Sequence, residues 1–146
     1  EDAVIADLSF VAPDGSASSL QDLYADGHNK LLLLVTAAGW CTACIEEQPA
    51  LQQRWEEHHA DGLAVVVVVF EDADFAPAGA DDAATWKDRH ELGFDVLADP
   101  DFALGAYYDR ELTPMNMLVD VETMTILRIG TGWDPSTVDA IIDARL

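Results

Sequence analysis

Residues 31–44 read LLLLVTAAGWCTAC and join an apolar strand to a pair of cysteines. The unbroken apolar run over 31–35 predicts a strand that is covered on both faces of its sheet. A helix is expected over about 42–59, so that Cys41 and Cys44 lie at its first turn. The valine-rich run 63–70 predicts a central parallel strand beside the first. This strand–turn–helix unit with a Cys-x-x-Cys motif at the turn is the core of our fold prediction.

The rest of the chain continues the alternation of strands and helices. Residues 71–84 are acidic, contain proline and glycine, and are expected to form a loop. Further strands are predicted over 7–11, 94–98, 115–120 and 125–129, and further helices over 20–25 (closed by a turn at Asp26-Gly27), 85–92, 99–107 and from 134 onward. No repeat or linker interrupts this order. It predicts a single domain over 1–146, of the α/β class, with three layers and a mixed sheet.

The charge of the chain excludes several classes of partner. It has 146 residues with 28 acidic against 7 basic side chains, a net charge of −21. So few basic groups cannot neutralise nucleic-acid phosphates or anionic lipid headgroups. No apolar stretch approaches the length of a membrane-spanning helix. We therefore expect no nucleic-acid partner and no membrane-spanning segment in this chain.

The two cysteines have the spacing that dithiol exchange requires. Cys41, at the helix N-terminus, is expected to be the activated and attacking thiolate, and Cys44, one turn inside, the resolving thiol. A purely structural disulfide across four residues would close almost no loop and stabilise little. A zinc site would need further ligands, and no histidine stands at zinc-finger spacing. Redox exchange is the favoured interpretation, with no metal site.

Four short motifs resemble one family. They are Trp40-Cys41-Thr42-Ala43-Cys44, Glu47-Gln48-Pro49, Thr113-Pro114 before a strand, and Met117-Leu118-Val119-Asp120. Together they resemble the thioredoxin superfamily, in particular its extracytoplasmic TlpA-like branch (redoxin domain), which reduces disulfides in cytochrome maturation. The stretch 10–20 is similar to the N-terminal extension of that branch. The resemblance implies a thioredoxin fold, α/β/α in three layers, with that extension.

The resemblance also implies roles for individual residues. Pro114 would follow a cis bond and pack against the disulfide, and the backbone of Thr113 would pair with an extended substrate. Glu47 would be the partly buried acid that carries the proton of Cys44. Trp40 would form a flat wall for substrate beside Cys41. No cofactor beyond the redox-active disulfide is implied.

The same resemblance suggests partners and location. Protein thiols and disulfides would be substrates, and a thiol protein would donate electrons. Separately, the high like charge of the chain disfavours association, so a monomer is expected. The location would be extracytoplasmic in a bacterium, periplasmic or secreted, with a membrane tether in the full-length precursor as one option. Thr42-Ala43 adds no positive charge to activate Cys41, which favours a reductant. Residues 37–39 replace the aromatic residue usual before the motif and are expected to widen the site.

Two other functions stay open. A peroxiredoxin-type thiol peroxidase shares the fold, although the position three before Cys44 is Cys41 where that class carries Thr. A non-enzymatic module could instead carry copper on the dithiol, assisted by soft ligands at Met115, Met117 and Met124.

Overall fold

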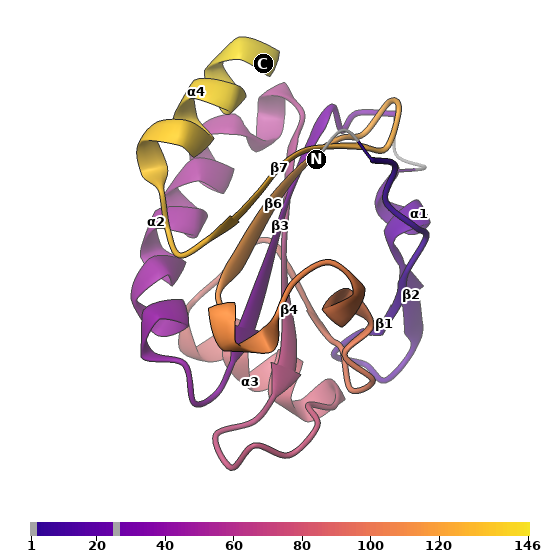
Figure 1. Cartoon of the computed structure of the whole chain (residues 1–146), viewed down its shortest axis with the longest axis vertical. Coiled ribbons are helices and arrows are strands. Elements are labelled where there is room, and N and C mark those ends of the chain that lie inside the picture. Colours follow the sequence, from indigo (N-terminus) through magenta and orange to yellow (C-terminus); the bar gives the residue numbers. More distant parts are fainter. Residues whose placement is uncertain (1–2, 25–26) are drawn as a thin grey trace.

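Seven strands form one mixed sheet in the computed structural model, which describes residues 3–24 and 27–146. The strand order is β2-β1-β5-β4-β3-β6-β7 (Figure 1). The strands are β1 (Ser9–Val11), β2 (Ala17–Ser19), β3 (Leu31–Ala38), β4 (Leu63–Glu71), β5 (Asp95–Ala98), β6 (Met115–Asp120) and β7 (Thr125–Thr131). β3, β4 and β5 are parallel, and β6, β7 and the β1–β2 hairpin add antiparallel pairs on either side.

The centre of the sheet is the part that the apolar runs predict. Every residue of β3 is buried, and β4 is buried except at Ala64. Strands covered on both faces need apolar side chains at successive positions, which the sequences of β3 and β4 supply. The predicted central parallel strand is confirmed.

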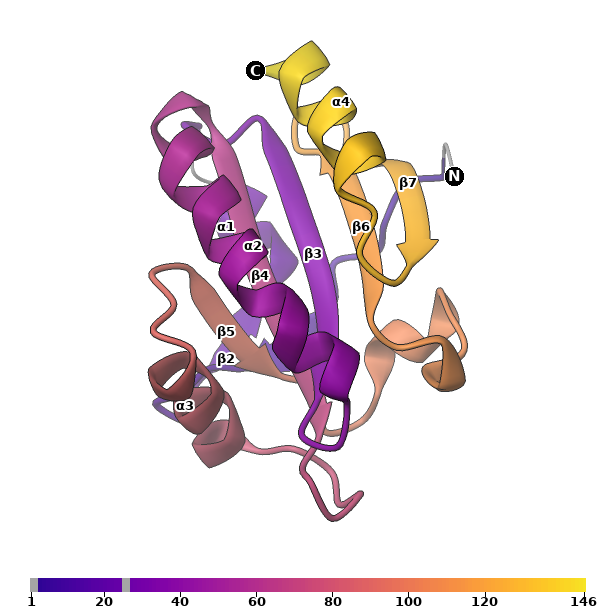
Figure 2. The ribbon, with the colours of Figure 1, turned by 90° about the vertical axis from the view of Figure 1, so that its left-hand side faces the viewer.

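Helices cover both faces of the sheet, as Figures 1 and 2 show. One face carries α2 (Thr42–His58), α3 (Ala80–Arg89) and α4 (Pro135–Arg145). The other carries α1 (Leu20–Tyr24) and the 3₁₀ turn η2 (Ala103–Ala106); the remaining 3₁₀ turns are η1 (His59–Asp61) and η3 (Arg110–Leu112). The crossover connections β3–α2–β4 and β4–α3–β5 move in the same direction across the sheet. Because crossovers between parallel strands share the right-handed sense, α2 and α3 lie on the same face. The predicted three-layer α/β arrangement is confirmed.

Two apolar clusters, one on each face, form the core. Leu33, Val67, Leu51 and Val138 belong to the cluster under α2 and α4, and Leu34 belongs to the cluster on the other face. Alternate residues of β3 therefore serve opposite layers, as the pleat of a strand requires. Within the described residues, none of the helices combines the length and the apolar character that crossing a bilayer demands.

Two predicted helices differ from the structure. α3 begins at Ala80 rather than Thr85, because the carboxylate of Asp82 accepts the N–H of Gly79 (2.8 Å) and stabilises an earlier first turn. The helix predicted over 99–107 is wrong: the Asp99 carboxylate accepts the N–H groups of Ala103 (2.8 Å) and Leu104 (3.1 Å) and closes only the turn η2.

Smaller differences concern the N-terminal extension. β2 was not expected from Ala-Ser-Ser, and it forms because it pairs with β1 across a turn in which Gly15 has a φ of +88°. The predicted helix over 20–25 is observed as α1, ending at Tyr24. The closing turn predicted at Asp26 lies outside the described residues.

Candidate active site

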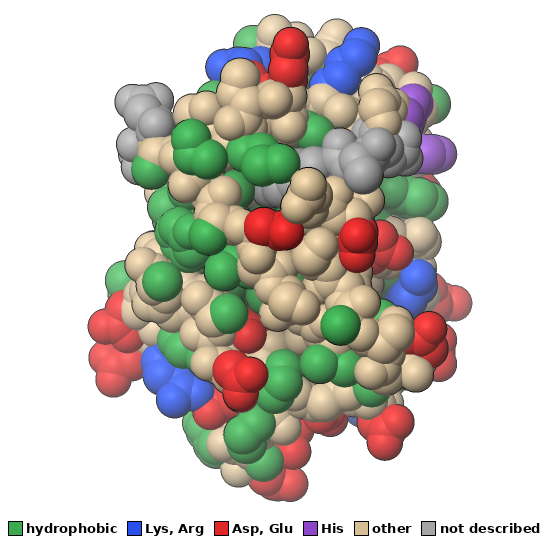
Figure 3. Space-filling model, turned by 90° about the vertical axis from the view of Figure 1, so that its right-hand side faces the viewer, with side chains coloured by type: hydrophobic (Ala, Val, Ile, Leu, Met, Phe, Trp, Pro, Cys, Tyr) green, Lys and Arg blue, Asp and Glu red, His purple; other side chains and the backbone are tan. Residues whose placement is uncertain are grey.

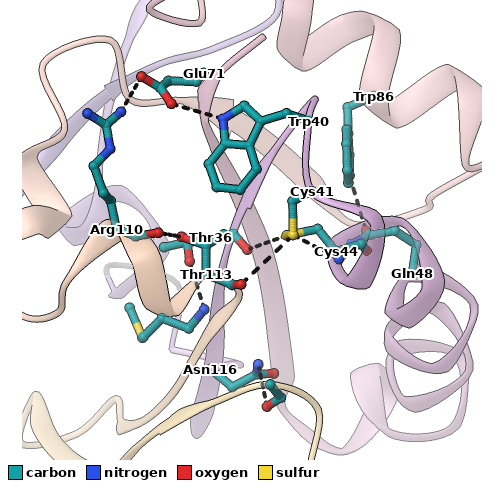
Figure 4. Close-up of a disulfide and its surroundings, with 12 residues drawn as sticks. Thr36, Trp40, Cys41, Cys44, Gln48, Glu71, Trp86, Arg110, Thr113 and Asn116 are labelled. Carbon is teal, nitrogen blue, oxygen red and sulfur yellow. Dashed lines mark hydrogen bonds and ion pairs between the residues drawn. A yellow bond between two sulfur atoms is a disulfide. The ribbon is translucent and has the colours of Figure 1, made fainter. Parts of the chain in front are cut away.

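The two cysteines form a disulfide at the first turn of α2 (Figure 4). Their Cα atoms are 5.3 Å apart, and Cys41 is the N-cap residue. Cys41 Sγ accepts the backbone N–H of Cys44 at 3.1 Å. Cys41 keeps 5% of its surface exposed, whereas Cys44 has none. The outer sulfur thus lies at the positive end of the helix, where a thiolate is stabilised, and the inner one is enclosed.

The loop before β6 approaches the disulfide from the opposite side. The Thr113–Pro114 peptide bond is cis, as the resemblance implied, and Pro114 is buried. The carbonyl oxygen of Thr113 lies 3.9 Å from Cys41 Sγ, and the carbonyl oxygen of Thr36 lies 3.9 Å from Cys44 Sγ. Each sulfur therefore has a carbonyl within reach that its reduced thiol could donate to.

Thr36 and Thr113 hold this loop in place. Thr36 Oγ1 accepts the N–H of Met115, the residue after the cis-proline, at 2.9 Å. The hydroxyl of Thr113 donates to the Arg110 carbonyl at 2.6 Å, and its N–H donates to the same carbonyl at 3.3 Å. An extended substrate that paired with the Thr113 N–H would replace the longer of these bonds.

Glu47 lies in α2, three residues after Cys44 and on the same face. It is 4% exposed, and neither carboxyl oxygen makes a hydrogen bond to any residue within the described ranges. Burial raises the pKa of Glu47 from 4.5 to about 8, and the amide of Asn116, which approaches the carboxyl without hydrogen-bond geometry, offsets part of the rise. A carboxyl with this pKa is close to the usual thiol value of about 8.5.

Trp40 is fixed by two elements distant in sequence. Its indole N–H donates to Glu71 Oε1 at 2.9 Å, and Glu71, at the end of β4, forms an ion pair with Arg110 (Figure 4). The indole also stacks on Phe75, with ring centroids 5.5 Å apart and planes 15° apart. The guanidinium of Arg110 lies over the ring of Phe70 at 5.5 Å. The indole of Trp40 is therefore held in one orientation beside Cys41.

The expectation that residues 37–39 widen the site is wrong. A Cβ atom on Gly39 would lie 2.5 Å from the backbone nitrogen of Ala73. The Gly39 N–H also donates to the Glu71 carbonyl at 2.9 Å. The loop between β4 and α3 fills the space that a larger residue would need.

Gln48 joins the helix of the motif to α3. Its side-chain amide donates to the Cys44 carbonyl at 2.8 Å and accepts the indole N–H of Trp86 at 3.1 Å. Gln48 is fully buried, so both of its polar ends are satisfied inside the protein.

The methionines proposed as soft metal ligands do not face the cysteines. Met115 and Met117 belong to the apolar cluster on the α1 face, and Met124 packs against it, while both cysteines belong to the cluster under α2. Throughout residues 3–24 and 27–146, no three His, Cys, Asp or Glu side chains gather closely enough to hold a metal ion.

Several residues of the site were not identified from the sequence: Thr36, Phe75, Glu71 and Arg110. One signal was available for Glu71, because it directly follows the apolar run of a parallel strand, and sites form at the carboxyl ends of such strands. Phe75 and Arg110 carry no local motif.

Comparison with known proteins identifies the family. The sequence profile of the AhpC/TSA family matches residues 3–128. Thioredoxin-like protein YneN of Bacillus subtilis (strain 168) is 32% identical over 126 residues, which cover 86% of this chain and 69% of that protein.

Solved structures share the fold at lower identity. The thioredoxin domain of a thiol-disulfide oxidoreductase from Bacteroides vulgatus has a TM-score of 0.73 at 17% identity, covering 97% of this chain and 96% of that one. A secreted Mycobacterium tuberculosis disulfide oxidoreductase homologous to E. coli DsbE has a TM-score of 0.70 at 16% identity, covering 94% and 96%. The chain therefore belongs to the AhpC/TSA family, with the thioredoxin-like fold and the Cys-x-x-Cys disulfide of thiol–disulfide oxidoreductases.

Proposed function

We propose that this protein reduces disulfides in protein substrates, with Cys41 as the attacking and Cys44 as the resolving residue. The observation that carries the proposal is the position of Cys41. Its sulfur caps α2, receives the Cys44 N–H at 3.1 Å and lies 3.9 Å from the carbonyl that precedes the cis-proline. At this position the helix N-terminus stabilises the thiolate form of Cys41. The same sulfur lies beside a backbone edge with which an extended substrate could pair.

The exchange begins with the reduced dithiol. The Cys41 thiolate attacks one sulfur of the substrate disulfide, that bond breaks, and the leaving sulfur departs as a thiolate that takes up a proton. Cys44, once deprotonated, attacks Cys41 in the mixed disulfide. The substrate cysteine is released as a thiol, and the Cys41–Cys44 disulfide holds the oxidation. Two electrons pass from the protein to the substrate.

Glu47 would accept the proton of Cys44 in the second step. The pKa of its carboxyl is raised to about 8, close to that of an ordinary thiol, so the free-energy change of proton transfer between the two groups is small. Burial causes this rise, and Cys44 is itself fully buried, so its thiol is shielded from solvent. Trp40, Thr113 and Pro114 would form the substrate-facing walls on either side of Cys41.

Direction, partners and location complete the proposal. The disulfide itself is the only redox group required, so no bound cofactor is invoked. A thiol protein would regenerate the dithiol, and we propose that the chain acts as a monomer. The extracytoplasmic space of a bacterium, periplasmic or secreted, is supported by the secreted character of the M. tuberculosis relative in fold.

The test combines a potential with single-cysteine variants. Equilibration in graded thiol buffers should give a reversible transition nearer roughly −270 mV than −120 mV; a pair that stays oxidised well below about −300 mV would be structural and would refute the proposal. Wild type should accelerate insulin reduction by dithiothreitol, and Cys41→Ser should not. Cys44→Ser should accumulate a mixed disulfide with insulin, and its absence would assign the attack to another sulfur.

A further inference from the structure

A tight loop next to the disulfide holds an aromatic side chain out in solvent. The Asp72 carboxylate accepts the N–H groups of Asp74 (2.8 Å) and Ala76 (3.0 Å), and the Phe75 N–H donates to the Asp72 carbonyl at 3.2 Å. Phe75 has a φ of 66°, a left-handed conformation that is unfavourable for a residue with a Cβ atom. It is nevertheless 65% exposed. Burial therefore does not explain this conformation; the hydrogen bonds of Asp72 hold it, and strained backbone residues cluster at functional sites.

The exposed ring continues the wall beside Cys41. Phe75 stacks on Trp40, which directly precedes Cys41, and Trp40 in turn packs edge-on against Phe70. We call Trp40 and Phe75 the aromatic shelf. Figures 1 and 2 place the loop that carries Phe75 at the same end of the sheet as the N-terminus of α2. The shelf thus begins at the reacting sulfur and leads away from it.

Exposed apolar side chains concentrate around this end of the molecule. Among the side chains whose exposure the structure describes, the large, apolar and exposed ones are Val4, Ile45, Phe75 and Leu112. Ile45 is in the first turn of α2, and Leu112 directly precedes Thr113. On the face that carries α1 and β2, Figure 3 shows acidic groups interspersed with apolar ones, and basic groups are isolated. Large apolar side chains exposed close to a reactive disulfide favour an interaction site at that end of the molecule.

A hollow beside the shelf has a defined charge. Its volume is about 440 Å³, and it is lined by Trp40, Glu71, Phe75, Arg110 and Glu111. Two carboxylates and one guanidinium give it a net charge of −1, with Arg110 already paired to Glu71. The chain around it carries −21. A lysine or arginine of a partner would be attracted here, and an acidic residue repelled.

We propose that the aromatic shelf and this hollow dock an extended protein segment that carries an apolar side chain next to a basic one, beside the cysteine under attack. The apolar side chain would lie on Phe75, and the basic one would meet Glu111. This inference rests on the proposed function and names the substrate class of the same site.

Four synthetic peptides test the preference. Each is an acetylated hexapeptide with one glutathionylated cysteine, and they differ only in two residues before it: Leu or Ser, combined with Lys or Glu. Pre-reduced protein is mixed with each peptide, and the free peptide thiol is measured after acid quenching to give a second-order rate constant. The Leu–Lys peptide should react fastest, by about 3- to 10-fold over the Ser–Lys peptide.

Variants assign the preference to the shelf. With Phe75→Ala, the Leu and Ser peptides should react with equal rate constants. With Glu111→Gln, the ratio of the rate constants of the Lys and Glu peptides should fall by about two- to five-fold. Because each ratio is taken within one variant, a general loss of folded protein cancels. Val4→Ala, an exposed apolar control, should keep both ratios. Equal rates for all four peptides with wild type would overturn the docking proposal alone, whereas no release from any peptide or from hydroxyethyl disulfide would overturn the function.

Discussion

Replacing Glu47 by glutamine should change how the stability of the oxidised protein depends on pH. The pKa of Glu47 is raised from 4.5 to about 8 by burial, so the folded state binds this proton more tightly than the unfolded state. The contribution of this proton to the free energy of unfolding is fully present below pH 4.5 and is lost as the pH rises through about 8. Between these values, the free energy of unfolding should fall by about 1.4 kcal/mol per pH unit because of this group.

Glutamine keeps the shape of the side chain but removes the titration. From about pH 5 to pH 7 the free energy of unfolding of the wild type should therefore fall by about 2–3 kcal/mol, a loss that Glu47→Gln does not suffer. Urea unfolding of both proteins across this range measures the difference, and carboxylates common to both cancel. Glu46→Gln is the matched control, because Glu46 is an exposed neighbour on the same helix. A difference between wild type and Glu47→Gln that does not change with pH would refute a buried carboxyl with a raised pKa.

Three further predictions follow from contacts of the site. Trp86→Phe leaves the buried Oε1 of Gln48 without its donor and should lower the free energy of unfolding by about 1–3 kcal/mol, measured in urea. Thr36→Val leaves the Met115 N–H without its acceptor and should cost a similar amount, while Thr36→Ser should restore most of it. Cys41→Ser should consume hydrogen peroxide no faster than the variant lacking both cysteines; rapid consumption would favour the peroxidase alternative.

The sequence predicts an element best where the structure that its local residues favour is also the one that the packing of the whole domain requires. The apolar runs of β3 and β4 are long enough to exclude other readings, and Asp134 accepts the Thr137 N–H at the start of α4 as its Asp-Pro signal indicates. At Asp99 the same Asp-Pro signal fails. Phe102 turns at a φ of 49° and packs against Phe70, with ring centroids 4.8 Å apart, so core packing overrides the helix.

The candidate site divides in the same way. Cys41, Cys44 and Glu47 lie within one short segment, where spacing along a helix predicts their arrangement. The residues that fix Trp40 come from distant segments: Glu71 reaches Trp40 from the end of another strand, and Arg110 reaches Glu71 from the turn before the cis-proline. Their meeting depends on the register of β3 beside β4 and β6, which no local pattern encodes.

The close packing of Gly39 against the backbone of residues 72–73 has an evolutionary consequence. The turn that carries the cysteines contacts the loop that carries Phe75 through backbone atoms, which no side-chain substitution can remove. We therefore expect the two segments to be exchanged together. A chimera that imports a bulkier residue at 39 from a relative should displace the loop unless it also imports residues 71–76. The proposed docking loop and the redox motif are thus expected to be transferred as one unit, and family members are expected to vary at these two segments in concert.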